Sequence, residues 1–560
     1  MAGENDTGVL GLAVPGVISY GLYAALKSSG ADPAYLYVSG GIAGFCGALT
    51  VIKFLIETKN WLQLRRMLRP QGIYGTTKPL NSQSPKELGL KTSNRSGKGM
   101  VLGAKRSDRR NRLLFYDGDG HGLYVSGTGG GKSNSLSKPF RLSLGAEVNA
   151  IITAKGEDMA VSLYRFITEE LRQTCVCIDP YRLMKAHGIK CDDYNPCDRL
   201  VELAREESPV VFEAAREIAK IMLVDPSAGG GDNKIFRDMG REFIALSLVL
   251  LAIEEAETGE LCCNPAHLNR ILSDGTDRLN RFFIQMASCP HYDDTVARAG
   301  RKFLSKIEKS AKSAESFLTE AQMALAPFEP VSAIGNSVEF STFNPADLKT
   351  PGKGITVFIV LPLEASHLAD LYTGLCVDTL ASRCLAANRA EPRVVIIADE
   401  FENLSRGPLP VVERILKLGR TRGVQLHAFI QDLGGLEARY KELTSMFISQ
   451  SAILMAFDIR SAKDAEMYSK RAGQQSIVTD SASASKHGAG SLNVKEEGIP
   501  LMRQDQFTQL PKFCAVLFKD QHPPMIVDLV HYKAVDPWNA LVDDVPGVAP
   551  EPDFKVRFKA

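Results

Sequence analysis

The sequence lacks the residue spacings that mark a disulfide framework or a zinc site. It has 11 cysteines, but no two of them form a C-x-x-C pair, and no histidine stands near them at ligand spacing. Cys175 and Cys177 alternate within TCVCID, which is typical of a buried strand. Scattered cysteines of this kind indicate a reducing compartment.

The chain also has almost no net charge. At +1 over 560 residues, the whole-chain balance implies no charged partner. The distribution is uneven, because Lys59 to Arg141 holds 17 Lys and Arg against 4 Asp and Glu. Such a basic block suits nucleic-acid phosphates or anionic headgroups, and the alternative is a solvated flank on the cytoplasmic side of a membrane. No basic motif interleaved with aromatic residues decides between them.

Charge is missing altogether from two runs near the N-terminus, Val9 to Leu26 and Tyr35 to Ile52, of 18 residues each. A run of this length can just span hydrocarbon as a helix. The acidic start MAGENDTG argues against a cleaved signal peptide. We therefore expect a two-helix transmembrane hairpin at 1–58, with spans of about 9–27 and 35–56; a buried globular hairpin is the alternative. Basic residues follow the second uncharged run and place both termini in the cytoplasm: Lys53, Lys59, Arg65, Arg66 and Arg69.

The rest of the chain has an α/β pattern interrupted by a helical region. Apolar strand runs alternate with helical segments, which predicts a parallel sheet with crossovers. From about Asp198 to Pro330 the apolar spacing is helical, with almost no strand signal. We expect the following organisation: a basic linker with the first short strands at 59–112, a nucleotide-binding domain at 113–196 and 333–536, an inserted all-α domain at 197–332, and an extended tail at 537–560.

A glycine-rich loop follows the short apolar run GLYVSG. SGTGGGKS matches the phosphate-binding pattern G-x-x-x-x-G-K-[ST], except that serine takes the first glycine position. Successive N–H groups of such a loop curl around a β-phosphate, the lysine neutralises phosphate oxygens, and the last serine ligates Mg²⁺. A bare structural turn is the alternative. The candidate nucleotide ligands are Ser126, Gly127, Thr128, Gly129, Gly130, Gly131, Lys132 and Ser133.

The run VVIIADE supplies the acidic half of such a site. An acid at the end of a buried parallel strand lies beside the phosphate loop, where Asp399 could hold Mg²⁺ and Glu400 could polarise the attacking water. Gln431 ends the next strand run and could sense the γ-phosphate. Arg420, in KLGRTRG, could reach a neighbouring subunit's site and stabilise transition-state charge, although a surface arginine at a helix end is the alternative.

Several motifs in order resemble the type IV secretion coupling proteins, the TraG/TraD-like conjugative ATPases. They are IYGTTKPLN, DGDGHGLYVSGTGGGKS, ITAKGEDMA, YNPCD, VVIIADEFENLSRGPLP and LGRTRGVQLHAFIQDLGGLEARY, within about Gly72 to Asp536. The resemblance implies a RecA-like domain that binds ATP and Mg²⁺, an inserted all-α domain, and a hexamer on the bacterial inner membrane. It assigns Lys132 and Ser133 to Walker A, Asp399 and Glu400 to Walker B, and the arginine finger to Arg420.

The resemblance further implies a motor that brings relaxase-bound single-stranded DNA to a type IV secretion channel. The alternative is an ATP-binding receptor that selects protein effectors without moving DNA. The chain departs from the family pattern at two positions: Gly127 stands where a proline is common, and Thr153 stands where many members have an acid. No long acidic tail follows Asp536, so docking to a relaxosome through such a tail is not expected.

Overall fold

The computed structural model describes residues 7–30, 32–67, 80, 84–106, 112–225, 234–362, 366–483, 491–545 and 558–559. The chain divides into two units, of which the smaller comprises Met1–Thr77 and Gly473–Leu501 and the larger comprises Lys78–Ala472 and Met502–Ala560. The nucleotide-binding motifs all lie in the larger unit.

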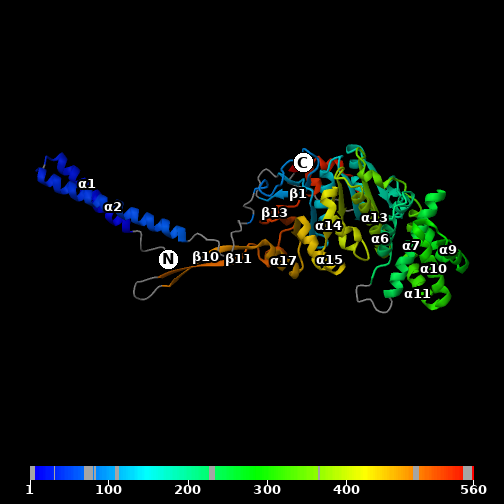
Figure 1. Ribbon diagram of the computed structural model, residues 1–560. Helices are drawn as coiled ribbons and strands as arrows, with labels where there is room; N and C mark the ends of the chain where they lie inside the picture. Colours follow the sequence, from blue (N-terminus) through cyan, green and yellow to red (C-terminus); the bar gives the residue numbers. More distant parts are fainter. Residues whose placement is uncertain are drawn as a thin grey trace. The chain divides into compact units, whose positions relative to one another are not determined.

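In the smaller unit, helices α1 (Thr7–Ser28) and α2 (Pro33–Met67) lie side by side (Figure 1). Among the described residues, one segment is long and apolar enough to cross a membrane, Pro33–Ile56 within α2. Of the two predicted transmembrane spans, only the second therefore meets this criterion among the described residues, and the two-span hairpin is not confirmed. α2 also continues as a helix to Met67, beyond the predicted end of the second span, because LQLRRM consists of good helix formers.

The smaller unit also contains an antiparallel ribbon of β10 (Gln474–Ser483) and β11 (Ser491–Pro500), paired over their full length. The sequence pattern did not predict this ribbon. Its strand residues are largely polar, with no long apolar run of the kind that marks the buried strands. A ribbon of two strands buries too little apolar surface to leave a strong sequence signal.

An 11-stranded sheet forms the centre of the larger unit, in the order β2-β1-β13-β12-β9-β3-β8-β7-β4-β6-β5. Neighbours from β9 to β5 are parallel, and those from β2 to β9 are antiparallel. The strand bounds are β1 Met100–Lys105, β2 Leu113–Tyr116, β3 His121–Ser126, β4 Asn149–Lys155, β5 Thr174–Ile178, β6 Ile355–Leu361, β7 Val394–Ala398, β8 Val424–Ile430, β9 Ser451–Phe457, β12 Cys514–Lys519 and β13 Met525–Asp528.

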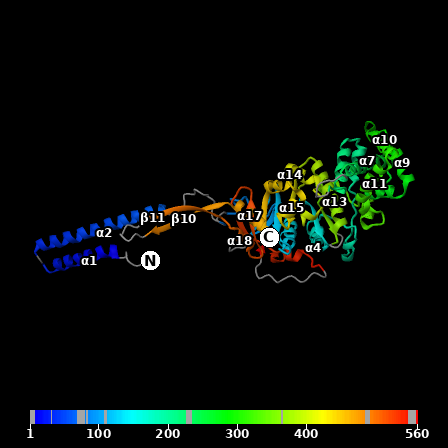
Figure 2. The same cartoon turned by 90° about the horizontal axis from the view of Figure 1, so that it is seen from below.

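The predicted parallel sheet is confirmed for the strands from β9 to β5 in the sheet order. The antiparallel extension by β12, β13, β1 and β2 was not predicted. Helices cover both faces of the sheet (Figure 2). The chain moves along the sheet in one direction after β3 and β4 and in the other after β6 and β7. Right-handed crossovers therefore put α3 and α4 on one face and α13 and α14 on the other.

The helices that cover this sheet are α3 Lys138–Ser143, α4 Asp158–Arg165, α13 Ser366–Ala386, α14 Pro410–Arg422, α15 Leu433–Tyr440, α16 Leu443–Gln450, α17 Ala462–Ala472 and α18 Gln504–Thr508. Gly423 ends α14 at φ 60°, and a Cβ there would lie 1.7 Å from the Ala390 carbonyl oxygen, so only glycine fits.

Between β5 and β6 the described chain is helical, as predicted. Figure 1 shows α7, α9, α10 and α11 gathered at one end of this unit. Phe243, Phe283, Phe303 and Phe317 pack at their centre with ring centroids 5.4 to 6.0 Å apart. The helices are α5 Asp198–Arg205, α6 Val210–Met222, α7 Lys234–Thr258, α8 Pro265–Ser273, α9 Thr276–Ala287, α10 His291–Lys309, α11 Ala311–Leu325 and α12 Ala333–Ser337.

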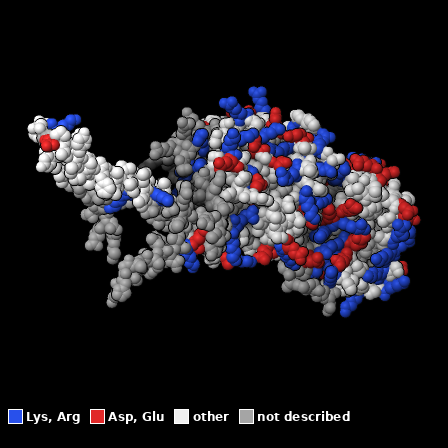
Figure 3. Space-filling view, turned by 60° about the vertical axis from the view of Figure 1, so that its left-hand side comes forward, with Lys and Arg blue, Asp and Glu red and all other residues white. Residues whose placement is uncertain are grey.

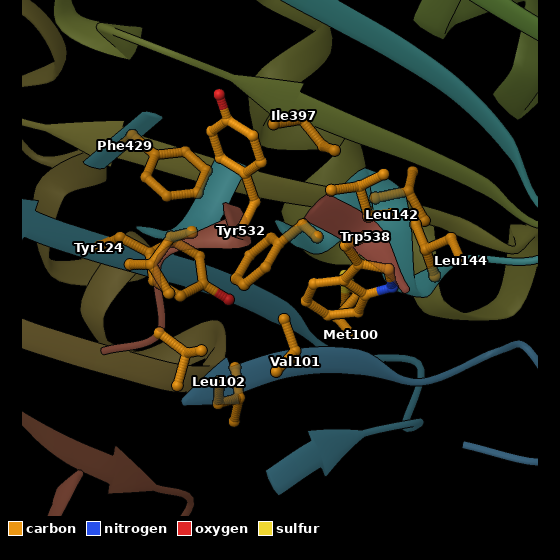
Figure 4. Packing of buried hydrophobic residues seen from close by; sticks show 14 of the residues in the cluster. Met100, Val101, Leu102, Tyr124, Leu142, Leu144, Ile397, Phe429, Tyr532 and Trp538 are labelled. Atoms are coloured by element: carbon orange, nitrogen blue, oxygen red, sulfur yellow. The ribbon is translucent and has the colours of Figure 1, made fainter. Parts of the chain in front are cut away.

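The C-terminal segment departs from the expected extended tail. Trp538 begins a short helix, α19 (Trp538–Leu541), and is only 4% exposed. Tyr532 and Trp538 lie with Met100, Leu142 and Leu144 in the buried cluster shown in Figure 4. The two rings bury a large apolar area, which holds this part of the tail on the domain. Just before α19, β14 (Val535–Asp536) pairs with β15 (Phe558–Lys559), which lies near the end of the chain.

Candidate nucleotide-binding site

The glycine-rich loop joins the end of β3 to a helical segment. β3 ends at Ser126, which is fully buried, and a π-helical turn (Ser133–Ser137) follows the loop and continues into α3. β8 lies beside β3 and β7 lies beside β8, all parallel. The loop therefore lies at the carboxyl edge of the sheet, where open α/β folds bind ligands.

The loop has a conformation that demands glycine at three positions. Gly129 and Gly131 have φ angles of 80° and 83°, which only glycine adopts without strain. At Gly130 a Cβ would lie 2.2 Å from the Ser126 Oγ. The serine in the first position of the motif is thus accommodated by the absence of a side chain at Gly130.

The two predicted motifs meet in space. The Ser133 hydroxyl donates a hydrogen bond of 2.8 Å to Asp399 Oδ2, across 266 positions of sequence. The Lys132 ammonium donates a hydrogen bond of 2.7 Å to the Ser126 carbonyl oxygen and so lies over the loop. This arrangement depends on β7 and β3 lying two places apart in the sheet, with β8 between them.

Asp399 has an electrostatic environment suited to a cation. Burial raises the pKa of Asp399, while the Ser133 hydroxyl and the Lys132 charge act in the opposite direction. A hydroxyl and a carboxylate are hard oxygen donors of the kind that Mg²⁺ prefers. Within the described part of the chain, no cluster of three or more His, Cys, Asp or Glu side chains could hold a metal alone. A cation here would therefore share phosphate oxygens with Ser133 and Asp399.

Glu400 and Gln431 lie at the ends of β7 and β8. Glu400 has left-handed backbone angles of 50° and 50°, an unusual conformation for a residue other than glycine. The Gln431 N–H donates a 2.8 Å hydrogen bond to Glu402 Oε1. Glu402, which the sequence reading did not single out, thereby joins the segment after Glu400 to the end of β8.

Comparison with known proteins assigns the family. The family model for conjugative DNA transfer by the type IV secretory system matches residues 80–555. This chain belongs to that family. A search of curated proteins finds no sequence match.

Solved coupling proteins share the fold. TrwBdeltaN70 in its unbound monoclinic form has a TM-score of 0.56 at 15% identity, over 81% of this chain and 93% of that chain. TrwB in complex with ADP and Mg²⁺ has a TM-score of 0.53 at 15% identity, over 73% and 85% of the two chains. TrwB with the ATP analogue ADPNP has a TM-score of 0.54 at 16% identity, over 81% and 94%.

In this coupling protein Arg420 lies far from the other candidate residues. It is in the last turn of α14, and its guanidinium pairs with Asp119 Oδ1 at 3.0 Å. Asp119 precedes β3, whereas the glycine loop follows it, so the six-residue strand separates them by roughly 20 Å. The structure therefore brings Lys132, Ser133, Asp399, Glu400 and Gln431 to one edge of the sheet and Arg420 to the opposite edge.

Two further residues of the coupling protein hold the glycine loop. The Asp458 carbonyl oxygen accepts a 3.2 Å hydrogen bond from the Gly127 N–H. Arg460 donates to the Thr128 carbonyl oxygen at 3.0 Å and to Asp458 Oδ2 at 2.9 Å. In the sequence, Asp458 and Arg460 are the polar residues directly after the apolar run SAILMAF, which forms β9. Their role was missed because the position of β9 beside β3 is decided by the sheet order.

The second departure from the family pattern lies in the interior. Thr153 is 2% exposed in β4 and lies beside Ala398 of β7 in the sheet register. An acidic side chain at this position would be desolvated, at a cost of several kcal/mol if unpaired. Threonine at this position avoids that cost.

Proposed function

We propose that this coupling protein hydrolyses ATP with Mg²⁺ and uses the hydrolysis to drive a relaxase-bound single DNA strand into a type IV secretion channel. The observation that carries the proposal is the hydrogen bond between Ser133 and Asp399, because it joins the phosphate loop to the acidic strand end at one point. The complexes of TrwB with ADP and Mg²⁺ and with ADPNP support nucleotide binding by a protein of this fold.

Each residue has a role that follows from its position. The loop N–H groups from Gly127 to Gly131 and the Lys132 ammonium bind the phosphates. Ser133 and Asp399 would hold Mg²⁺, which would supply charge neutralisation at the phosphate oxygens. Glu400 orients the attacking water, and Gln431, held through its N–H by Glu402, senses the γ-phosphate.

We further propose that the protein is a hexamer in which Arg420 acts on the neighbouring subunit's nucleotide. Arg420 lies too far from the phosphate loop of its own subunit to act there, so it could act in hydrolysis only at a neighbouring subunit's site. An arginine supplied from a neighbour stabilises the charge of a phosphoryl-transfer transition state. A ring built from repeated head-to-tail contacts presents one subunit's edge to the next.

The inner membrane is the proposed location, with a two-span anchor and the larger unit in the cytoplasm. Figure 3 shows a largely uncharged surface along the paired helices α1 and α2, between the charged groups at the tip and the basic groups in the second half of α2. Large apolar side chains are exposed along both helices: Val17, Ile18, Tyr20, Leu22, Tyr37, Val38, Ile42, Phe45, Val51, Ile52, Phe54, Leu55 and Ile56. Apolar surface of this extent marks contact with lipid or protein.

The decisive experiment measures ATP turnover by the full chain in detergent, with and without single-stranded DNA. We expect the strand to stimulate turnover, and Lys132→Ala to abolish it while membrane insertion and fold are retained. Lys185→Ala is the matched control, because Lys185 is exposed on a turn away from the loop. Turnover in Lys132→Ala equal to that of the control would refute the assignment. Turnover that responds to a secreted protein but not to DNA would instead favour the effector receptor.

A further inference from the structure

A cavity lies where the inserted helices meet the segment that follows the acidic strand end. Its volume is about 610 Å³, within the range of ligand sites. The inserted domain contributes the end of α6 and part of α7, and the sheet domain contributes Glu402 to Pro408 and residues of α15. It is separate from the phosphate loop, since no loop residue lines it.

Most of the charged side chains in the cavity wall are basic. Lys220 and Arg241 approach from the inserted helices, and Arg406, Arg439 and Lys441 approach from the sheet domain. Lys220, Arg406 and Lys441 are exposed, so they face solvent at the mouth. Five positive groups drawn from two domains concentrate a potential that favours an anionic ligand.

The two carboxylates in the wall do not cancel this charge. Asp225 pairs with Arg241 at 2.9 Å and with Arg237 at 3.6 Å, so two arginines of α7 already share its charge. Glu402 is 8% exposed, and its Oε1 accepts the Gln431 N–H at 2.8 Å. Burial raises the pKa of Glu402, which favours its neutral form. The wall therefore holds five basic side chains against two acidic ones.

The wall also adjoins the hydrolytic site. Glu402 and Asn403 belong to the 3-10 turn that begins directly after Glu400. Glu402 Oε2 has no hydrogen-bond partner among the described residues, while its Oε1 holds the Gln431 N–H. A ligand that changed the position of Glu402 would therefore act on both Glu400 and Gln431.

We propose that this cavity binds the phosphodiester backbone of the transferred single strand and couples strand binding to hydrolysis through Glu402. The inference rests on the proposed function. Arginine and lysine contacts to phosphates supply most of the affinity for a single strand and need no base sequence, as a protein that moves DNA requires. The cavity gives these contacts a defined place beside the Walker B segment.

The first test compares two double variants of the full chain in detergent. Lys220→Gln with Lys441→Gln removes two cavity charges, and Lys463→Gln with Lys470→Gln removes two from α17, where both lysines are exposed and paired with surface acids. Binding of an oligothymidylate of about 20 nucleotides, longer than a typical single-strand site, is measured by fluorescence anisotropy with an ATP analogue present. We expect the cavity variant to bind the strand about tenfold more weakly. The slope of log affinity against log salt concentration should fall in magnitude by about 1.4, because two phosphate contacts are lost.

A footprint on the wild-type chain serves if the cavity variant fails to fold. Lysines are acetylated with and without the strand and quantified by mass spectrometry. The strand should protect Lys220 and Lys441 but not Lys470. Glu402→Ala should bind the strand and the nucleotide normally while losing strand-stimulated turnover, and Glu402→Gln, which keeps the Gln431 contact, should retain most of it.

The outcomes separate the inference from the proposed function. Equal strand affinity for the two double variants, with strong binding by the wild type, would overturn the cavity assignment alone. Equal protection by a free mononucleotide would assign the cavity to a small nucleotide and overturn the inference as well. A wild-type chain that neither binds the strand nor responds to it would overturn the proposed function and the inference together.

Discussion

Replacement of Arg420 by alanine separates a catalytic role in trans from a structural role. Within one subunit, Arg420 lies near Asp119, at the amino end of β3, whereas the phosphate loop follows its carboxyl end. Six residues of strand span roughly 20 Å, which is well beyond the reach of an arginine side chain. A direct action of Arg420 on hydrolysis therefore requires the neighbouring subunit's site.

The expected magnitudes differ enough to distinguish the two roles. The pair with Asp119 is exposed on both sides, at 61% and 60%, so its loss costs about 0 to 1 kcal/mol of stability. An arginine that stabilises a phosphoryl-transfer transition state contributes roughly 10³ to 10⁵ in rate, or about 4 to 7 kcal/mol. We expect Arg420→Ala to fold and bind ATP normally while losing turnover by at least about 10³. Asp119→Ala is the control that breaks the same pair.

The assay mixes Arg420→Ala subunits with Lys132→Ala subunits. An interface is active when an Arg420→Ala subunit supplies the intact phosphate loop and its Lys132→Ala neighbour supplies the intact arginine. In a random equal mixture about one quarter of the interfaces of a closed ring meet both conditions. Independent sites would then restore about one quarter of wild-type turnover.

One result refutes this reasoning. If mixed rings form, as shown by co-purification of two different tags, and turnover stays at the level of either variant alone, Arg420 does not act across the interface. Loss of activity in Asp119→Ala equal to that in Arg420→Ala would also contradict it, because the ion pair itself would then be the important element.

Three further predictions address the site, the fold and the anchor. Glu400→Gln should bind an ATP analogue with unchanged affinity but stall hydrolysis, and lost binding by calorimetry would make Glu400 structural. Burial raises the pKa of Asp378 to about 7, and its Oδ1 accepts the Val411 N–H. Between about pH 4 and pH 7 the folded state therefore keeps a proton on Asp378 that the unfolded state has lost. This contribution to the free energy of unfolding is present below pH 4, and roughly 4 kcal/mol of it is lost as the pH rises to about 7. Asp378→Asn should therefore match the melting temperature of the wild type near pH 4 and exceed it at pH 8. A difference in melting temperature that does not change with pH would contradict this. Reporter fusions after Ser29 and after Asn60 should give opposite topology signals, and matching signals would exclude the two-span anchor.

The sequence alone determined the features that depend on local pattern. Apolar runs predicted the parallel strands, helical spacing predicted the inserted helices, and the segments SGTGGGKS and VVIIADE identified Lys132, Ser133 and Asp399. These features are readable because each depends on a few neighbouring residues whose backbone requirements are strict, such as the positive φ angles of Gly129 and Gly131.

Tertiary structure alone decided which distant segments meet. The antiparallel strands β12, β13, β1 and β2 extend the sheet, and β9 brings Asp458 and Arg460 to the phosphate loop. β8 places Gln431 beside Glu402, and the basic cavity forms where the inserted helices and the segment after β7 share a wall. Contacts of this kind depend on strand order and on crossovers between segments hundreds of residues apart, so no local window of sequence contains them.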